Sequence, residues 1–375
     1  MNNKTILHVY ERLEGLLAKL PEPLHKPISK EMATIRNLFL QQRPPRIVIA
    51  GEPGPSKAHV LNALFNAEVI GANEAADSGP EWREYRSMHG ALRVLDVRRP
   101  GAENAARSAL ADEAPDVFLF LRSTPGVDEA LAAETADFNT LLEFLNARDA
   151  RREAVVGVLV RNDAAVDVAG VEAAREQLHA CLHTKPAVSE RMAATLAVTA
   201  PRFRMDGSMD ATETGRQSTE RLAQVIAEEL PEEARLEMAR LCGVRDVQMK
   251  IAQTLIKAVT AICATIGVQP IPFADYPILT GLQVMMISGI MHISGRAISV
   301  KAVGEFVAAL GVNAGAGLVL REGSRALLKL VPVWGNLVSG AIAGGGTYAL
   351  GRAAAGYFIE GVGIKDARKL FRRKE

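Results

Sequence analysis

The chain has little of what marks several specialised classes of protein. It contains only three cysteines (Cys181, Cys242 and Cys263), too few and too widely spaced for a small domain built on disulfide bonds. Aromatic residues make up only 5% and are not interleaved with basic residues, so we expect no nucleic-acid partner. Charges interrupt the N-terminal apolar residues, so we expect no secretory signal and assign a reducing cytoplasm.

The chain does have enough apolar residues for a large core. Of its 375 residues 48% are hydrophobic, which excludes a disordered chain, and the length predicts two or three domains. The formal net charge of +1 is unevenly distributed along the chain. Residues 251–375 carry a net charge of +7, and the preceding residues carry a net charge of −6. The sequence is therefore bipartite.

From residue 46 onward, short β-branched or apolar runs alternate with alanine-rich helical stretches. We expect strands at 46–51, 91–97, 116–122, 154–163 and 194–200. Strands separated by helices of this length are typical of an α/β fold, a mainly parallel sheet with helices on both faces.

Helical patterns flank these strands on both sides. Apolar residues recur at helical spacing over 4–20, and a second helix is predicted over about 27–42. Over 232–266 we expect one long helix or two, broken near Gly243. We therefore predict an N-terminal helical segment (1–43), an α/β domain (46–230) and an all-α C-terminal domain (232–375).

The most informative motif directly follows the first predicted strand. A Gly-x-x-x-x-Gly-Lys-Ser/Thr loop between a strand and a helix holds phosphates with backbone N–H groups and the lysine, and its hydroxyl binds Mg²⁺. Here Gly51, Ser56, Lys57 and Ala58 take those positions, and Gly54 lies inside the loop. These five residues are the candidate phosphate-binding residues.

The next helix contains Leu-Asn-Ala-Leu-Phe at 61–65, and with it the segment 46–230 resembles the Era-like family of bacterial GTPases. The resemblance implies a P-loop GTPase-like sheet that binds GTP or GDP. It assigns Asp96 to the family's Asp-x-Pro-Gly motif, although Pro100 and Gly101 come two residues late. It also assigns Asn162 and Asp163 to the guanine-reading motif, and Thr199 and Ala200 to the Ser-Ala motif.

The reactive residue types of the family are nevertheless altered. Ala58 lacks the hydroxyl that binds Mg²⁺, and no threonine between Thr34 and Thr124 can sense the γ-phosphate. Ser56 adds a side chain where glycine allows close approach to phosphate. We expect GTP or GDP to bind weakly and without Mg²⁺, or not at all. No catalytic residue or metal ligand is assigned.

Residues 268–358 resemble the helical domain, often predicted to be membrane-associated, that follows some Era-like GTPases. The matching pieces are Pro270–Asp275, Leu282–Ile287 and Val331–Gly335. Residue type supports a membrane role independently, because the uncharged runs 276–295 and 330–351 are long enough to span a bilayer. Gly340 and Gly344 have small-xxx-small spacing, and the basic tail at 365–374 would favour an anionic cytoplasmic leaflet.

A soluble helical bundle is the alternative for this region. Gln283, Ser288 and His292 dilute the first uncharged run, and six glycines dilute the second. Methionines such as Met285 and Met286 are more typical of an adaptable core than of a ligand site.

His179 and His183 lie one turn apart on a predicted helix, with Cys181 between them. A metal site would need this pair and at least one more ligand, and none is near in sequence. We interpret these residues as an ordinary helix end with favourable cations.

These observations together predict a pseudo-GTPase that acts as a membrane-associated scaffold or regulatory subunit, cytoplasmic and peripheral or integral at the inner membrane. One alternative is a slow GTPase that uses Lys57, Asp96 and Asp163 on membranes or with a partner. Another is a soluble interaction module that uses no nucleotide. A related intact GTPase is a candidate heterodimer partner.

Overall fold

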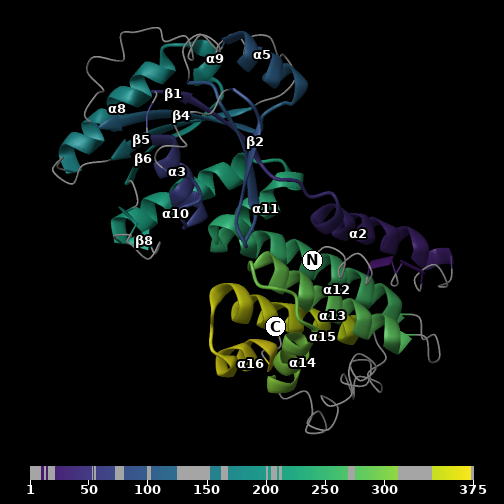
Figure 1. Ribbon diagram of the computed structural model, residues 1–375. Helices are drawn as coiled ribbons and strands as arrows, with labels where there is room; N and C mark the ends of the chain where they lie inside the picture. The colour runs from purple at the N-terminus through teal and green to yellow at the C-terminus, as the bar shows by residue number, and fades with distance from the viewer. Residues whose placement is uncertain are drawn as a thin grey trace. The chain divides into compact units, whose positions relative to one another are not determined.

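The computed structural model of the chain forms two compact units (Figure 1). The sheet unit is Arg43–Val244, and the flanking unit combines Met1–Gln42 with Arg245–Glu375. The structure describes residues 10–11, 14–15, 22–52, 54, 56–71, 80–98, 103–124, 153–161, 168–199, 202–203, 209–210, 213–268, 275–310 and 340–372.

The sheet unit is built on a six-stranded, mostly parallel sheet. Its strands are β1 (Arg46–Gly51), β2 (Arg83–Arg86), β3 (Ala91–Asp96), β4 (Val117–Thr124), β5 (Ala154–Arg161) and β6 (Met192–Thr199). They are arranged in the order β2-β3-β1-β4-β5-β6, and only the β2–β3 pair is antiparallel. The predicted mainly parallel α/β sheet and its five strands are confirmed, while β2 was not predicted.

Helices cover both faces of this sheet (Figure 1). They are α3 (Ser56–Phe65), α5 (Glu103–Asp112), α8 (Val168–His183), α9 (Pro186–Ser189), α10 (Glu213–Glu229) and α11 (Glu232–Cys242). Leu110 of α5 and Leu178 of α8 join a buried cluster with Val48, Leu95 and Phe118 of the strands. Because β1 and β5 are buried on both faces, they are near-continuous apolar runs rather than alternating ones. A separate two-stranded ribbon pairs β7 (Arg202–Phe203) with β8 (Met209–Asp210).

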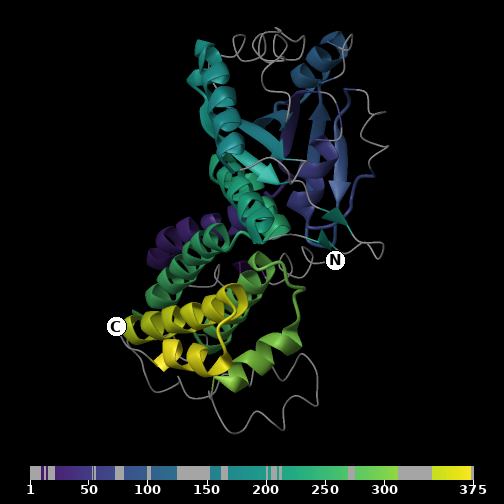
Figure 2. The ribbon, with the colours of Figure 1, turned by 90° about the vertical axis from the view of Figure 1, so that its left-hand side faces the viewer.

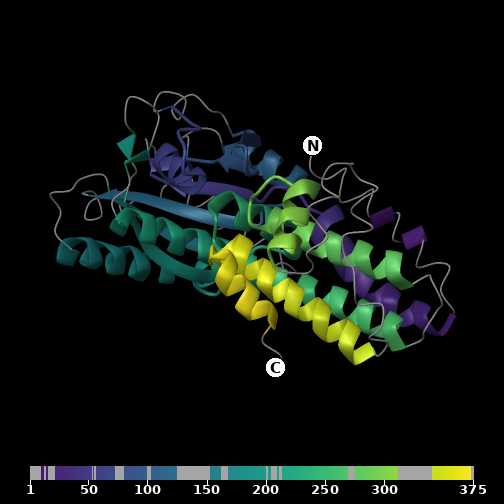
Figure 3. The same ribbon diagram turned by 90° about the horizontal axis from the view of Figure 1, so that it is seen from below.

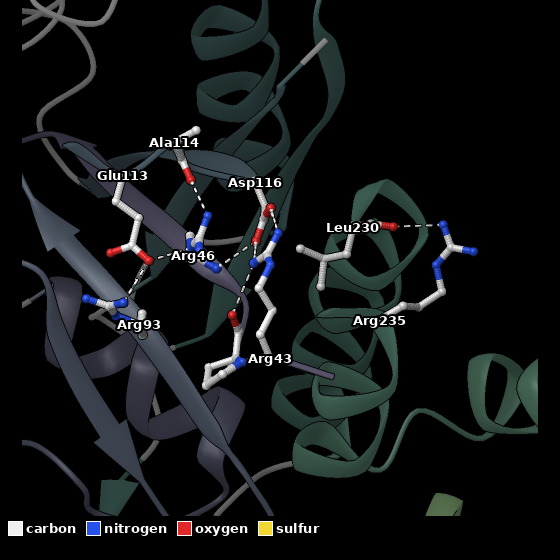
Figure 4. Close-up of polar contacts among 9 residues, drawn as sticks. Arg43, Arg46, Arg93, Glu113, Ala114, Asp116, Leu230 and Arg235 are labelled. Atoms are coloured by element: carbon white, nitrogen blue, oxygen red, sulfur yellow. Dashed lines mark hydrogen bonds and ion pairs between the residues drawn. The ribbon is translucent and has the colours of Figure 1, made fainter. Parts of the chain in front are cut away.

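Ionic contacts hold the amino edge of the sheet together (Figure 4). The guanidinium of Arg43 donates two hydrogen bonds to Asp116, at 2.7 and 2.6 Å, and the backbone N–H of Arg46 donates to the same carboxylate at 2.9 Å. The side chains of Arg46 and Arg93 contact Glu113 Oε1 at 2.6 and 2.7 Å. The hydrogen bonds from Arg43 to Asp116 raise the pKa of Arg43. These contacts join the starts of β1 and β4 to the neighbouring strand β3.

The described elements of the flanking unit are helices. They are α2 (Glu22–Leu40), α12 (Arg245–Val268), α13 (Asp275–Ile293), α14 (Val300–Ala309), α15 (Gly340–Ala355), the π-helix η4 (Gly356–Glu360) and α16 (Ile364–Arg372). Helix α12 packs against α2, α13 and α15 (Figure 3). After η4 the chain reverses at Gly361, with φ at 74°, and α16 packs back on α15 (Figure 2). The predicted break near Gly243 is confirmed, because α11 ends at this residue in the left-handed conformation.

One helix in the described part of the chain is long and apolar enough to cross a membrane. It covers Arg245–Gly267, with a mean hydropathy of 1.3, and half of its apolar window is buried inside the protein. Most of the uncharged run at 276–295 lies in α13. The apolar part of this helix, Ile278–Ile293, is shorter than the candidate span in α12. Met285, Met286 and Met291 on α13 are buried core residues, as the sequence predicted. Much of the second run, 330–339, lies outside the described residues.

Gly351 and Gly345 share helix α15 but differ in their surroundings. A Cβ added at Gly351 would lie 2.7 Å from Ile256 Cγ1 and 3.1 Å from Met286 Sδ, whereas one added at Gly345 would meet no atom within 4 Å. We expect Gly351→Ala to lower the free energy of unfolding by about 1–3 kcal/mol through overpacking. We expect Gly345→Ala to raise it by about 0.5–1 kcal/mol through helix propensity. Chemical denaturation followed by circular dichroism measures both, and equal shifts would contradict this packing of α15.

Candidate functional site

The loop between β1 and α3 begins with a close approach of two strands. Gly51 has φ at 105°, and a Cβ on this residue would lie 2.2 Å from the carbonyl oxygen of Leu121 in β4. The next backbone N–H, that of Glu52, donates to the same carbonyl at 2.9 Å, and the Glu52 carboxylate accepts from the N–H of Ser123 at 2.9 Å. Only glycine fits at position 51, because both the φ angle and the space exclude a side chain.

This loop lies where open parallel sheets usually bind ligands. Strand β1 has β3 on one side and β4 on the other. The connection from β1 leads to β2 and β3 on one side, whereas the connection from β3 leads to β4 on the other side. Ligands bind at such a switch point in open α/β sheets. Helix α3 begins here at Ser56, and the N-terminus of a helix favours an anion.

A guanidinium from the segment after β3 occupies the loop. Arg98 Nη1 donates to the carbonyl oxygens of Glu52 and Gly54 at 2.9 and 3.3 Å, and to Ser56 Oγ at 3.0 Å. Its Nε and Nη2 donate to the two carboxylate oxygens of Asp96 at 2.8 and 3.0 Å. The side chain is only 3% exposed. The loop therefore holds a cation with its oxygen atoms, whereas a phosphate-binding loop directs N–H groups at an anion.

Lys57 lies on the other side of the same carboxylate. Its ammonium is 3.1 Å from Asp96 Oδ2, and its side chain is 1% exposed. Burial lowers the pKa of Lys57 more strongly than the charge and hydrogen bond of Asp96 raise it. For Asp96 burial alone would raise the pKa, but the hydrogen bonds and charge of Arg98, with the charge of Lys57, outweigh it and lower the pKa. The buried carboxylate of Asp96 therefore contacts two cationic side chains, Arg98 and Lys57.

The structure brings together five of the predicted site residues and separates one. Five predicted residues contact the Arg98 side chain or lie next to a residue that contacts it: Gly51, Gly54, Ser56, Lys57 and Asp96. Ala58 is buried in the first turn of α3. Thr199 ends β6, three strands from β1, which is about 14 Å at the usual strand spacing. Asn162, Asp163 and Ala200 lie outside the described residues.

Arg98 is the functional residue that the sequence analysis missed. The available signal was the two-residue delay between Asp96 and Pro100-Gly101, which places an arginine two positions after the aspartate. Spacing alone did not indicate that this side chain reaches the loop.

Comparison with known proteins gives no further assignment. No protein-family model matches the chain, and no curated protein is significantly similar to it.

Removing the guanidinium should destabilise the sheet unit. Arg98→Met leaves Asp96 buried and the loop carbonyls without their donor, so we expect a loss of about 3–5 kcal/mol in the free energy of unfolding. Arg107→Met, on the exposed face of α5, is the matched control and should stay within about 0.5 kcal/mol of the native protein. Urea denaturation measures both, and equal losses would contradict this assignment.

The pH dependence of the free energy of unfolding is a second measurement of the contact between Arg98 and Asp96. Since the pKa of Asp96 is lowered in the fold, its stabilisation is complete above the unfolded pKa of about 3.9 and is lost as the pH falls through the lower folded value. Stability of the Arg98→Met protein should therefore fall less steeply below about pH 4 than that of the native protein.

Proposed function

We propose that the chain is a pseudo-GTPase that acts as a scaffold or regulatory subunit at the cytoplasmic face of a membrane. The observation that carries the proposal is the buried guanidinium of Arg98 in the β1–α3 loop, where a nucleotide phosphate would otherwise bind.

The fold supports a GTPase origin for this site. The loop follows the central strand β1 at its carboxyl end, and Ser56 and Lys57 open the helix behind it. Asp96 ends the neighbouring strand β3, where the GTPase resemblance assigns it. The order of the strands and the position of the loop support this origin, because ligands of open α/β sheets bind at such a position.

The charges of the site oppose nucleotide binding. A phosphate would have to separate Arg98 from Asp96 and then lie against the carbonyl oxygens of Glu52 and Gly54. Lys57, which would contact phosphate, already contacts Asp96, and Ala58 supplies no hydroxyl for Mg²⁺. Arg98 and Lys57 carry two positive charges, and the carboxylates of Asp96 and Glu52 balance them, so the site attracts a triphosphate weakly. Its role is then to fix the ends of β1 and β3 and the start of α3.

Nucleotide binding tests this proposal directly. Isothermal titration of the full chain with GTP and with GDP, with and without Mg²⁺, should give no saturable heat at micromolar nucleotide. The same result is expected for Lys57→Ala. Saturable binding by the native protein that Lys57→Ala abolishes would overturn the proposal and support the slow GTPase instead.

Two features of the flanking unit support membrane association. Helix α12 has the length and composition of a spanning segment. Helix α16 is amphipathic, because Ala367 is buried and Leu370 is half-buried, while Lys365, Lys369 and Arg372 are exposed. Lys369 pairs with Asp366 at 2.8 Å, a surface contact that contributes little. Such a basic surface is attracted to anionic headgroups.

Vesicle binding tests the membrane part. The full chain should co-sediment with vesicles of mixed phosphatidylcholine and phosphatidylglycerol, and more weakly with phosphatidylcholine alone. Replacing Lys365, Lys369 and Arg372 by alanine should cost about 3 kcal/mol of binding, at about 1 kcal/mol for each basic residue near the surface. The matched control replaces the exposed Arg107, Arg216 and Arg221 of the sheet unit by alanine. Equal losses in the two triple variants, or no binding by the native chain, would refute the assignment.

A further inference from the structure

Two histidine side chains lie together on the exposed face of α8. His179 and His183 are one helical turn apart, and their ring centroids are 4.3 Å apart with an interplanar angle of 59°. Both residues are exposed to solvent. Residues four apart on a helix are neighbours, so the two rings can address one ligand.

A threonine hydroxyl contacts the ring of His179. His179 Nδ1 is 3.0 Å from Thr195 Oγ1 of β6, and the same hydroxyl donates to Met192 Sδ at 4.0 Å. A hydroxyl with its hydrogen on the sulfur can accept from Nδ1–H of His179. In that tautomer the lone pair of the imidazole is on Nε2.

A serine hydroxyl holds the second ring in the same way. His183 Nδ1 is 2.7 Å from Ser189 Oγ at the end of α9. Both rings are therefore held through Nδ1 by hydroxyls from other elements. Metal-binding histidines usually have this arrangement, in which a partner on one ring nitrogen orients the other nitrogen toward the metal.

Charged side chains share this part of α8 with the two histidines. Arg175 is hydrogen-bonded to Glu172, and Glu176 is 3.9 Å from the same guanidinium.

We propose that His179 Nε2 and His183 Nε2 form a surface site for one divalent transition-metal ion of the Cu²⁺ or Zn²⁺ type. Imidazole suits both ions, and Cu²⁺ binds more tightly than Zn²⁺ at a given site. Within the described residues no group of three histidine, cysteine or acidic side chains surrounds the pair, so water completes the coordination. The site would join α8 to β6 and α9 through the two hydroxyl contacts.

Cys181 is not a ligand in this proposal. It lies two residues from each histidine, so it points about 200° around the helix from both.

Titration of the full chain with CuCl₂, and separately with ZnCl₂, tests the site. We expect one equivalent to bind, with Cu²⁺ tighter than Zn²⁺, and the paramagnetic spectrum of the Cu²⁺ form to show two imidazole nitrogens. Thr195→Val keeps the shape of the side chain but removes the hydroxyl, and should weaken binding by about 10-fold to 100-fold. Thr195→Ser should restore it. His179→Ala and His183→Ala should each weaken binding more than Thr195→Val.

His89→Ala and Cys181→Ser are the matched controls. His89 is an exposed single histidine of the same unit, so neither change should alter affinity. The proposal is overturned if either histidine of the pair can be lost without effect, if Cys181→Ser weakens binding as much as the histidine variants, or if the spectrum shows only one imidazole. Equal affinities of Thr195→Val and the native protein would refute the orienting role of the hydroxyl, and with it the built site.

Discussion

The hydrogen-bonded ion pair of Arg98 with Asp96 is the interaction on which the carboxyl edge of the sheet depends. Two buried charges are costly unless their remaining donors and acceptors are satisfied. Here the β1–α3 loop supplies the missing acceptors, because the carbonyls of Glu52 and Gly54 and the hydroxyl of Ser56 all face the guanidinium. One arginine thus links the β1–α3 loop, the start of α3 and the end of β3.

Most of the sheet could be predicted, because its strands are buried on both faces and so appear as apolar runs in the sequence. Strand β2 could not, since its four residues, Arg-Glu-Tyr-Arg, are mostly exposed and carry no apolar pattern. The break at Gly243 was predictable from a glycine at a helix end. The packing of α2 against α12 depends on contacts between residues more than two hundred positions apart, which no local pattern records.

The sequence predicted where the candidate site lies but not that the Arg98 guanidinium occupies it. Spacing placed Gly51, Lys57 and Asp96 around one loop, because a motif fixes where the backbone turns. It gave no information on Arg98, whose contacts depend on a side-chain path across two loops. The histidine pair was likewise predicted only in part. Helical spacing predicted that the rings are neighbours, whereas Thr195 and Ser189 come from other elements and became visible only in the fold.

The division of the chain at Gln42 and Val244 has a consequence for its synthesis. The sheet unit is continuous in sequence, so every strand and helix it needs has left the ribosome once Val244 has emerged. Helix α2 is made before the sheet unit, yet its partner α12 begins only at Arg245. During translation of the sheet unit, α2 lacks its contact with α12, and it carries apolar residues such as Ile35 and Phe39 that are buried in the finished fold. In this interval a chaperone that binds apolar helices would act on the nascent chain.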